Sequence, residues 1–158
     1  MKELSQQAQA AKLIRKELKV AFPDIKFRVT SKGYSMGDNV RIMWVNGPTR
    51  EQVQEISDKY QYGHFDGMID CYEYSNTRKD IPQTKFVFTE REVTKDIYDT
   101  MYDVWFSSFA SFEAIEGTKD KFLMNGKEET IRYMSSRFLN KIDLRKPLTE
   151  KRIYDTQF

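Results

Sequence analysis

The sequence has only one cysteine, Cys71, among its 158 residues. One cysteine cannot form an intramolecular disulfide, and this fits a reducing compartment, so we expect a cytoplasmic protein. No stretch approaches the roughly 18 apolar residues of a membrane span. The polar start MKELSQQAQAAK also lacks the apolar segment of a signal peptide. We therefore expect neither secretion nor a membrane partner.

The sequence also lacks a strong excess of either charge. Its 26 basic residues are opposed by 24 acidic ones, which gives a net charge of +2. A protein that binds nucleic acid mainly through charge is usually strongly basic. The near-neutral net charge therefore allows nucleic-acid binding only through a local basic face. Neither a glycine-rich phosphate loop nor a nucleophile elbow occurs. We therefore predict that the chain is not an enzyme and has no cofactor.

The content of hydrophobic and aromatic residues is typical of a folded globular protein. Hydrophobic residues make up 39% and aromatic residues 14%, and aromatic side chains bury large areas. The length is close to the commonest domain size, so we predict a single domain over 1–158. Within it we expect an α+β core over 1–92, a helical extension over 93–142 and a polar tail over 143–158.

Hydrophobic periodicity predicts an α+β fold with a small, mostly antiparallel sheet of about four strands. Three- and four-residue spacing of apolar residues is typical of an amphipathic helix, and alternation is typical of a half-buried strand. The expected elements are a helix from Leu4 to Ala21, strands over 25–30 and 40–45, a helix from Thr49 to about Tyr60, and strands over 68–74 and 85–90. The order is helix, strand, strand, helix, strand, strand.

Two further helices are predicted in the second half of the chain. The pattern from Thr94 to Phe112 is apolar on more than one side, so we expect this helix to cover the sheet. A helix over 127–142 would place four apolar residues on one face: Ile131, Met134, Phe138 and Leu139. The residues after Pro147 are polar and are expected to be loosely held.

Three strings in the first half carry a family resemblance: AKLIRKELKVAFPDIKFRV, YSMGDNVRIMWVNGPT and FDGMIDCYEY. In this order they resemble a large polyvalent-protein-associated domain, the type numbered twenty-nine, over about residues 10–76. The resemblance implies a protein of phages or other mobile elements, because such domains are carried there beside antirestriction or DNA-processing modules. It supplies no catalytic residue, and family likeness alone does not fix a function.

The densest group of possible metal ligands is His64, Asp66, Cys71 and Glu73. These residue types bind zinc, but their spacing matches no standard zinc signature. In a strand over 68–74, alternation would also turn Asp70 and Cys71 to opposite faces. We therefore expect no bound metal. We expect Asp66 and Gly67 of the FDG string to form a turn and Cys71 to pack as a small buried apolar residue.

Two binding surfaces are left as alternatives. Basic residues at helical spacing, with two more on the following strand, could contact phosphates: Lys12, Arg15, Lys16, Lys19, Lys26 and Arg28. Several aromatic side chains could add base stacking if they were exposed: Tyr34, Trp44, Tyr60, Tyr62, Tyr72 and Tyr74. Aromatic residues and methionine beside turn residues are typical anchors of protein interfaces, and here these are Tyr34, Met36, Tyr62 and Phe65.

The leading hypothesis is a non-enzymatic phage or mobile-element protein that binds a host defence protein. Such a protein would inhibit a CRISPR nuclease or a restriction enzyme. The alternative is a DNA- or RNA-binding accessory protein of element transfer or replication. The sequence leaves the oligomeric state open.

Overall fold

The computed structural model describes residues 2–108, 112–118, 121–130 and 137–156. They form two compact units, here called the first and the second unit. The first unit runs to Glu92, apart from Asn46–Thr49, which belong to the second unit together with the residues from Val93 onward. None of the helices in the described ranges is long and apolar enough to cross a membrane.

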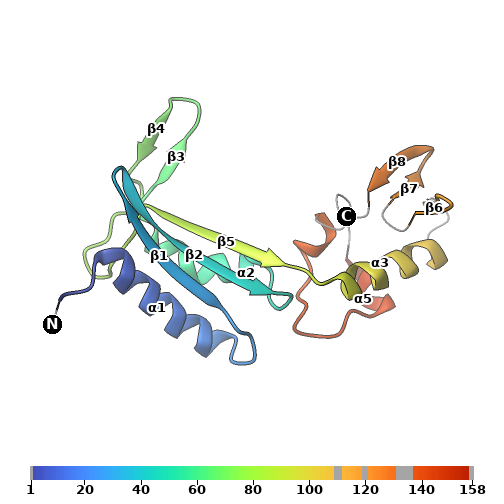
Figure 1. Ribbon diagram of the computed structural model, residues 1–158, viewed down its shortest axis with the longest axis horizontal. Helices are drawn as coiled ribbons and strands as arrows, with labels where there is room; N and C mark the ends of the chain where they lie inside the picture. The colour runs from blue at the N-terminus through green and yellow to red at the C-terminus, as the bar shows by residue number, and fades with distance from the viewer. Residues whose placement is uncertain (1, 109–111, 119–120, 131–136, 157–158) are drawn as a thin grey trace. The chain divides into compact units, whose positions relative to one another are not determined.

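The first unit follows the predicted order of helices and strands, with one strand more over residues 64–66 (Figure 1). Its five strands form a sheet of three and a separate pair, whereas one sheet of about four was expected. Its elements are α1 (Gln6–Ala21), β1 (Arg28–Tyr34), β2 (Gly37–Val45), α2 (Arg50–Ser57), the 3-10 helix η1 (Asp58–Tyr60), β3 (His64–Asp66), β4 (Cys71–Glu73) and β5 (Phe86–Glu92). The α+β class with small, mostly antiparallel sheets is therefore confirmed.

The predicted strands over 25–30 and 68–74 differ most from the structure in their limits. The strand expected over 25–30 begins only at Arg28, because Ile25 and Phe27 pack against the core before the pairing starts. The strand expected over 68–74 is reduced to β4, because Asp70 adopts a φ of 50° within a turn. Left-handed φ is a feature of turns and interrupts a strand.

The main sheet of the first unit has the strand order β1-β2-β5. β1 and β2 form an antiparallel hairpin, whereas β2 and β5 run parallel. Successive side chains of a strand point to opposite faces. Val29, Val40, Ile42 and Trp44 consequently share one face, and all four are buried.

Helices α1 and α2 cover that buried face. α1 contributes Ile14 and Leu18, whose side chains are fully buried, and α2 contributes Val53. Arg50 and Gln54 of α2 also donate hydrogen bonds to Thr89 Oγ1 on β5, each at 3.4 Å. The hydrophobic core of the first unit therefore lies on one side of the sheet.

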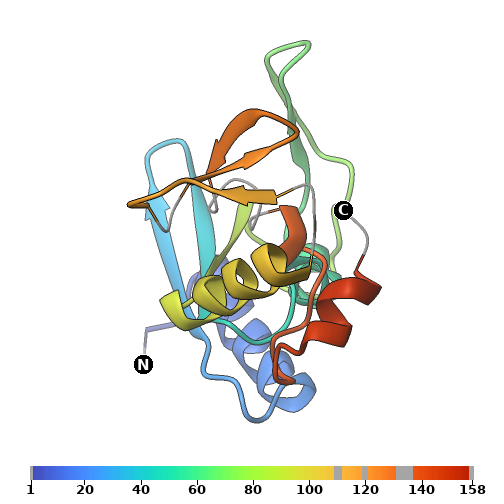
Figure 2. The same cartoon turned by 90° about the vertical axis from the view of Figure 1, so that its right-hand side faces the viewer.

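The second unit contains α3 (Lys95–Ser108), a three-stranded antiparallel sheet and α5 (Glu150–Asp155). Figure 2 shows α3 beside the sheet of β6 (Phe112–Ala114), β7 (Lys121–Met124) and β8 (Lys127–Thr130). The core of this unit consists of buried residues from its helices, strands and loops: Met101, Phe122, Phe138, Leu139, Ile142 and Ile153.

The helix predicted over 127–142 is wrong at its start, because residues 127–130 form β8. Asn125 and Gly126 both adopt positive φ, at 52° and 77°, and connect β7 to β8. Asn-Gly in this conformation is a strong hairpin signal. Residues 137–139 are helical, whereas 131–136 lie outside the described residues, as do 109–111 at the end of the first C-terminal helix pattern.

The residues after Pro147, expected to be loosely held, include an ordered helix. α5 begins after Thr149, whose side chain accepts a hydrogen bond from Arg152 N. Ile153 of this helix is only 1% exposed. Ile153 and Leu148 pack on the core of the second unit, and Arg152 donates hydrogen bonds to the Lys146 and Pro147 carbonyls, although most residues of the segment are polar.

A polar contact joins α1 to η1. Glu17 accepts hydrogen bonds from Lys59 Nζ at 2.8 Å and from Tyr60 Oη at 2.6 Å. Burial raises the pKa of Glu17, but these two hydrogen bonds outweigh that effect, so its pKa lies below the usual value. Burial and the hydrogen bond to Glu17 raise the pKa of Tyr60, which keeps its hydroxyl a donor.

Replacing this carboxylate is expected to destabilise the first unit. Glu17→Gln should lower the free energy of unfolding near pH 7 by about 1 kcal/mol, because a charged acceptor is lost beside a buried tyrosine. The folded pKa of Glu17 is depressed, so the stabilisation is present above the unfolded pKa of about 4.3 and is lost as pH falls through the folded pKa. Urea denaturation of both proteins across this pH range measures the difference.

The matched control is Glu90→Gln. The Glu90 carboxylate pairs with Arg41 at 3.3 Å, but both side chains are half exposed. Such pairs contribute at most about 1 kcal/mol and often nothing measurable. Equal destabilisation by the two variants, or a Glu17→Gln effect that persists undiminished at low pH, would contradict the assignment.

Candidate binding surfaces

The β3–β4 hairpin is anchored at its base by a cluster of tyrosines. The rings of Tyr62 and Tyr74 stack with centroids 5.6 Å apart, and Tyr72 contacts both of them edge-on. Tyr72 also packs on Phe86 of β5 at 5.5 Å and donates a hydrogen bond from Oη to the Lys85 carbonyl at 2.6 Å. Burial raises the pKa of Tyr72 to about 12, so its hydroxyl stays protonated and can donate.

The backbone at the same place is closely packed and leaves no room for a side chain at Gly63. A Cβ on Gly63 would lie 2.0 Å from the Glu73 carbonyl oxygen, so only glycine allows the two segments to approach this closely. Gln61 accepts a hydrogen bond from Val87 N at 2.7 Å and donates one to the Gly63 carbonyl at 2.6 Å. The base of the hairpin is thereby fixed to β5.

The tip of this hairpin exposes large apolar side chains. Phe65 is 53% exposed, Ile69 61% and Met68 93%. The turn itself is ordered by Asp66, whose Oδ1 accepts a hydrogen bond from Met68 N at 2.8 Å. Residues 64–74 contain three carboxylates and neither Lys nor Arg. The tip is therefore an apolar surface with acidic neighbours.

The four predicted protein-binding residues lie at this end of the first unit. Tyr34 is 43% and Met36 81% exposed, next to the β1–β2 turn. Lys85 donates a hydrogen bond to the Met36 carbonyl at 3.1 Å and places its ammonium 5.1 Å from the Tyr72 ring centroid, which links the turn to the tyrosine cluster. Tyr62 is half-buried within that cluster.

Phe65 alone among the predicted residues belongs to the hairpin tip. The sequence reasoning missed Met68 and Ile69, which it assigned to a strand. Their position between Gly67 and Asp70 was the available signal, because glycine and aspartate are frequent in turns and turns lie on the surface.

The metal candidates lie on one face of the hairpin. His64 pairs with Glu73 and Asp66 with Cys71, and the cross-strand partners in an antiparallel pair share a face. His64 Nε2 and Glu73 Oε2 lie 3.5 Å apart, while His64 Nδ1 lies 2.9 Å from Ser75 Oγ. Within the described residues, no three His, Cys, Asp or Glu side chains are grouped to hold a metal ion.

Two expectations about this face are wrong. Cys71 is exposed and not buried, because no described residue covers its side of the two-stranded hairpin. The alternation used to separate Asp70 from Cys71 does not apply either, since Asp70 lies in the turn and β4 begins at Cys71.

The basic stripe of α1 is exposed but is not one continuous site. Lys12, Lys16 and Lys19 lie on the solvent side of the helix. Arg15 instead donates a hydrogen bond from its guanidinium to the Val29 carbonyl of β1 at 2.7 Å. Part of the predicted phosphate-binding set is thus used to hold the fold together.

The second face of the main sheet carries no helix of the first unit within the described residues. We call it the open face. Alternation and strand register assign to it Arg28, Thr30, Lys32 and Tyr34 of β1, Asn39, Arg41, Met43 and Val45 of β2, and Phe86, Phe88, Glu90 and Glu92 of β5. Arg28 is the only residue of the predicted nucleic-acid set on these strands.

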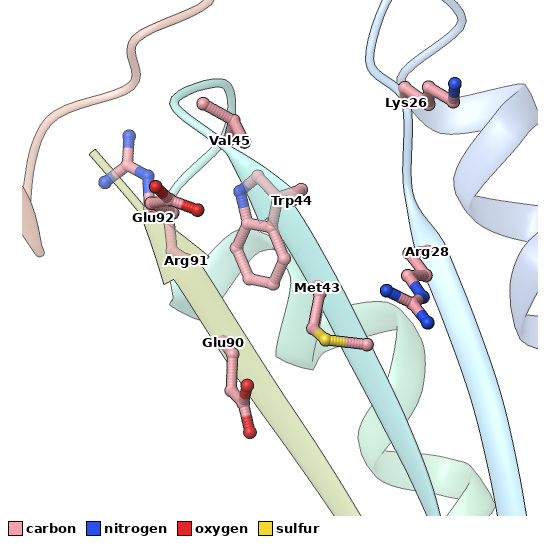
Figure 3. Close-up of a pocket in the computed structure, with 8 residues that line it drawn as sticks. All are labelled: Lys26, Arg28, Met43, Trp44, Val45, Glu90, Arg91 and Glu92. Atoms are coloured by element: carbon pink, nitrogen blue, oxygen red, sulfur yellow. The ribbon is translucent and has the colours of Figure 1, made fainter. Parts of the chain in front are cut away.

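Two shallow hollows lie on the open face. One, of about 550 Å³, is bordered by Lys26, Arg28, Met43 and Glu90 among others (Figure 3). The other, of about 510 Å³, is bordered by Arg28, Lys32 and Arg41 and by no carboxylate. The face is therefore basic over β1 and β2 and acidic at the far end of β5.

Aromatic rings lie beside the basic part of the open face. Phe86 and Phe88 stack with centroids 5.8 Å apart and planes 12° apart, and Phe88 is 40% exposed. The Arg41 guanidinium lies 5.9 Å from the Phe88 centroid. Of the aromatic residues predicted for stacking, Trp44 and Tyr60 are buried. The sequence reasoning missed Phe86 and Phe88, although alternation in KFVFTE places both on one face.

Comparison with known proteins gives one family match. The family model described as "Large polyvalent protein associated domain 29" matches residues 5–98. The match confirms the resemblance drawn from the three sequence strings and extends it at both ends. Neither a curated protein nor a solved structure matches the chain.

The exposure of Cys71 changes the expected effect of replacing it. Cys71→Ser should alter the free energy of unfolding by less than about 0.5 kcal/mol, because substitutions at exposed sites without special contacts are close to neutral. Chelator treatment should likewise leave the melting temperature unchanged. Urea denaturation and metal analysis of the purified protein check both statements. One tightly held zinc per chain, released with a loss of stability, would contradict them, because metal bound to the folded state adds to folding free energy.

Proposed function

The chain belongs to the Large polyvalent protein associated domain 29 family, which associates it with phages and other mobile elements, and on that premise we propose that it is a non-enzymatic anti-defence protein. It binds a host defence protein of the CRISPR-nuclease or restriction-enzyme type. The observation that carries the proposal is the apolar tip of the β3–β4 hairpin, with Phe65, Met68 and Ile69.

The energetics of the tip favour a protein partner. Complete burial of a Phe, Met or Ile side chain contributes about 1.5–3 kcal/mol. Three such side chains within one hairpin can therefore supply the anchor of an interface, where a few central residues carry most of the binding energy. The solvent-exposed tip gains this energy only when a partner covers it.

The fixed base makes the tip an effective anchor. Binding is weakened when flexible loops must be ordered. Here the Tyr72 contacts with Phe86 and Lys85, together with Gly63, hold the base of the hairpin before any partner arrives. Little further ordering is needed.

The charge of the hairpin favours a basic partner. Asp66, Asp70 and Glu73 accompany the apolar tip, without any Lys or Arg in residues 64–74. Nucleases that act on DNA or RNA expose basic surfaces to their substrates. An apolar pocket with a basic rim on such a nuclease complements the hairpin in both respects.

A phage-plating experiment tests this function. Host strains that each carry one defence system express the chain, and phage plating on them is compared with an empty vector. We expect plating to recover in the strain whose nuclease is bound, and the triple variant Phe65→Ala, Met68→Ala, Ile69→Ala to abolish that recovery. Val20→Ala is the matched control, because Val20 is 78% exposed on α1, away from the hairpin.

The same variants are used in capture of the purified nuclease after digestion of all nucleic acid. Retention by the wild type and by Val20→Ala, but not by the triple variant, is the expected result. Circular dichroism checks that the triple variant is folded. Unchanged plating in every defence strain, or retention that is lost on nucleic-acid digestion, would contradict the proposal.

A further inference from the structure

We infer that the open face of the main sheet is a second binding site, and that its ligand is single-stranded nucleic acid. The inference rests on the aromatic and basic side chains of β1, β2 and β5 and does not depend on the hairpin or its partner. Proteins that bind single strands combine a basic groove for the backbone with aromatic side chains on which bases stack. The open face has both features.

The phosphate-binding part is the hollow of about 510 Å³ over β1 and β2. Arg28, Lys32 and Arg41 border it, and no carboxylate does. The three cations lie close together on two adjacent strands. Arg41 of β2 pairs with Thr30 of β1, and Arg28 and Lys32 are the neighbours of Thr30 on the same face. A phosphodiester backbone that follows this hollow meets the positive charges of Arg28 and Lys32, whereas the charge of Arg41 is shared with Glu90, which lies 3.3 Å away.

The base-binding part is formed by Phe88 on one side and Tyr34 on the other. Phe88 is 40% and Tyr34 43% exposed, so each retains ring surface that water contacts. Phe88 lies on β5 and Tyr34 on β1. Because β2 lies between these two strands, they are about 10 Å apart. Phe86 stacks against Phe88 and supports its orientation.

A single strand fits this arrangement better than a duplex. Bases in a duplex are already paired and stacked, so exposed rings on a flat sheet can reach only unpaired bases. The two carboxylates of the face, Glu90 and Glu92, lie toward one end of β5, away from Tyr34. The charge of the face therefore limits the strand to the basic hollow and the rings beside it.

Fluorescence anisotropy with labelled oligothymidylate of about 20 nucleotides, longer than the roughly 4–16 nucleotides of comparable sites, tests the inference. Phe88→Ala should weaken binding by about 5- to 100-fold, while the salt dependence of binding stays the same. Phe88→Tyr keeps an aromatic ring and should therefore bind like the wild type. Lys32→Gln should weaken binding and lower the slope of log K against log salt by about 0.7. A duplex of the same length should bind more weakly and be insensitive to Phe88→Ala.

The controls distinguish this site from the basic stripe of α1. Lys16→Gln removes one exposed cation from the helix, and Val20→Ala removes one exposed apolar group. Both should bind like the wild type, and thermal denaturation confirms that all variants are folded. Absence of binding at about 50 mM salt, unchanged affinity in Phe88→Ala, or a loss in Lys16→Gln as large as that in Lys32→Gln would each overturn the inference.

Discussion

The parallel pairing of β2 with β5 is the constraint on which the first unit depends. Parallel neighbours need a long crossover, because the chain must return to the end of the sheet at which it started. Here α2 makes part of that return and packs on the face already covered by α1. The fully buried apolar core is thus placed on one side, and the opposite face is left to side chains such as Arg41 and Phe88, which are not covered by a helix of the first unit.

The same crossover explains where the hairpin is placed. After α2 the chain still has to reach the start of β5, and the β3–β4 hairpin is inserted in this interval. Polar side chains tie the interval to the sheet: Asp38 accepts hydrogen bonds from Thr84 Oγ1 and Lys85 N, both at 2.7 Å, and Gln83 donates to the Lys59 and Asn76 carbonyls. Buried polar groups that are fully hydrogen-bonded make such a segment rigid.

Local patterns predicted the elements of the first unit well. The amphipathic stripe of α1 and the alternation in β1, β2 and β5 depend on burial of one face, which a sequence records directly. The parallel partner of β2 was not predictable in this way, since pairing depends on contacts between distant residues. The β7–β8 hairpin was missed for a different reason: apolar spacing over 127–142 suggested a helix and outweighed the Asn125-Gly126 turn signal.

The candidate surfaces could be predicted only in part, because net charge and residue type do not give position. The net charge of +2 is summed over the whole chain, including an acidic hairpin tip and a basic sheet hollow. Each of these two surfaces acts on its own surroundings, because salt screens charges beyond about 8–10 Å. Arg15 was assigned to phosphate contacts from its helical spacing, yet its guanidinium is bonded to the Val29 carbonyl. Lys32 and Arg41 were not assigned, yet strand register brings both to one hollow. A near-neutral total charge therefore excludes neither an acidic contact with a protein nor a basic contact with a nucleic acid, provided that the two lie on different surfaces.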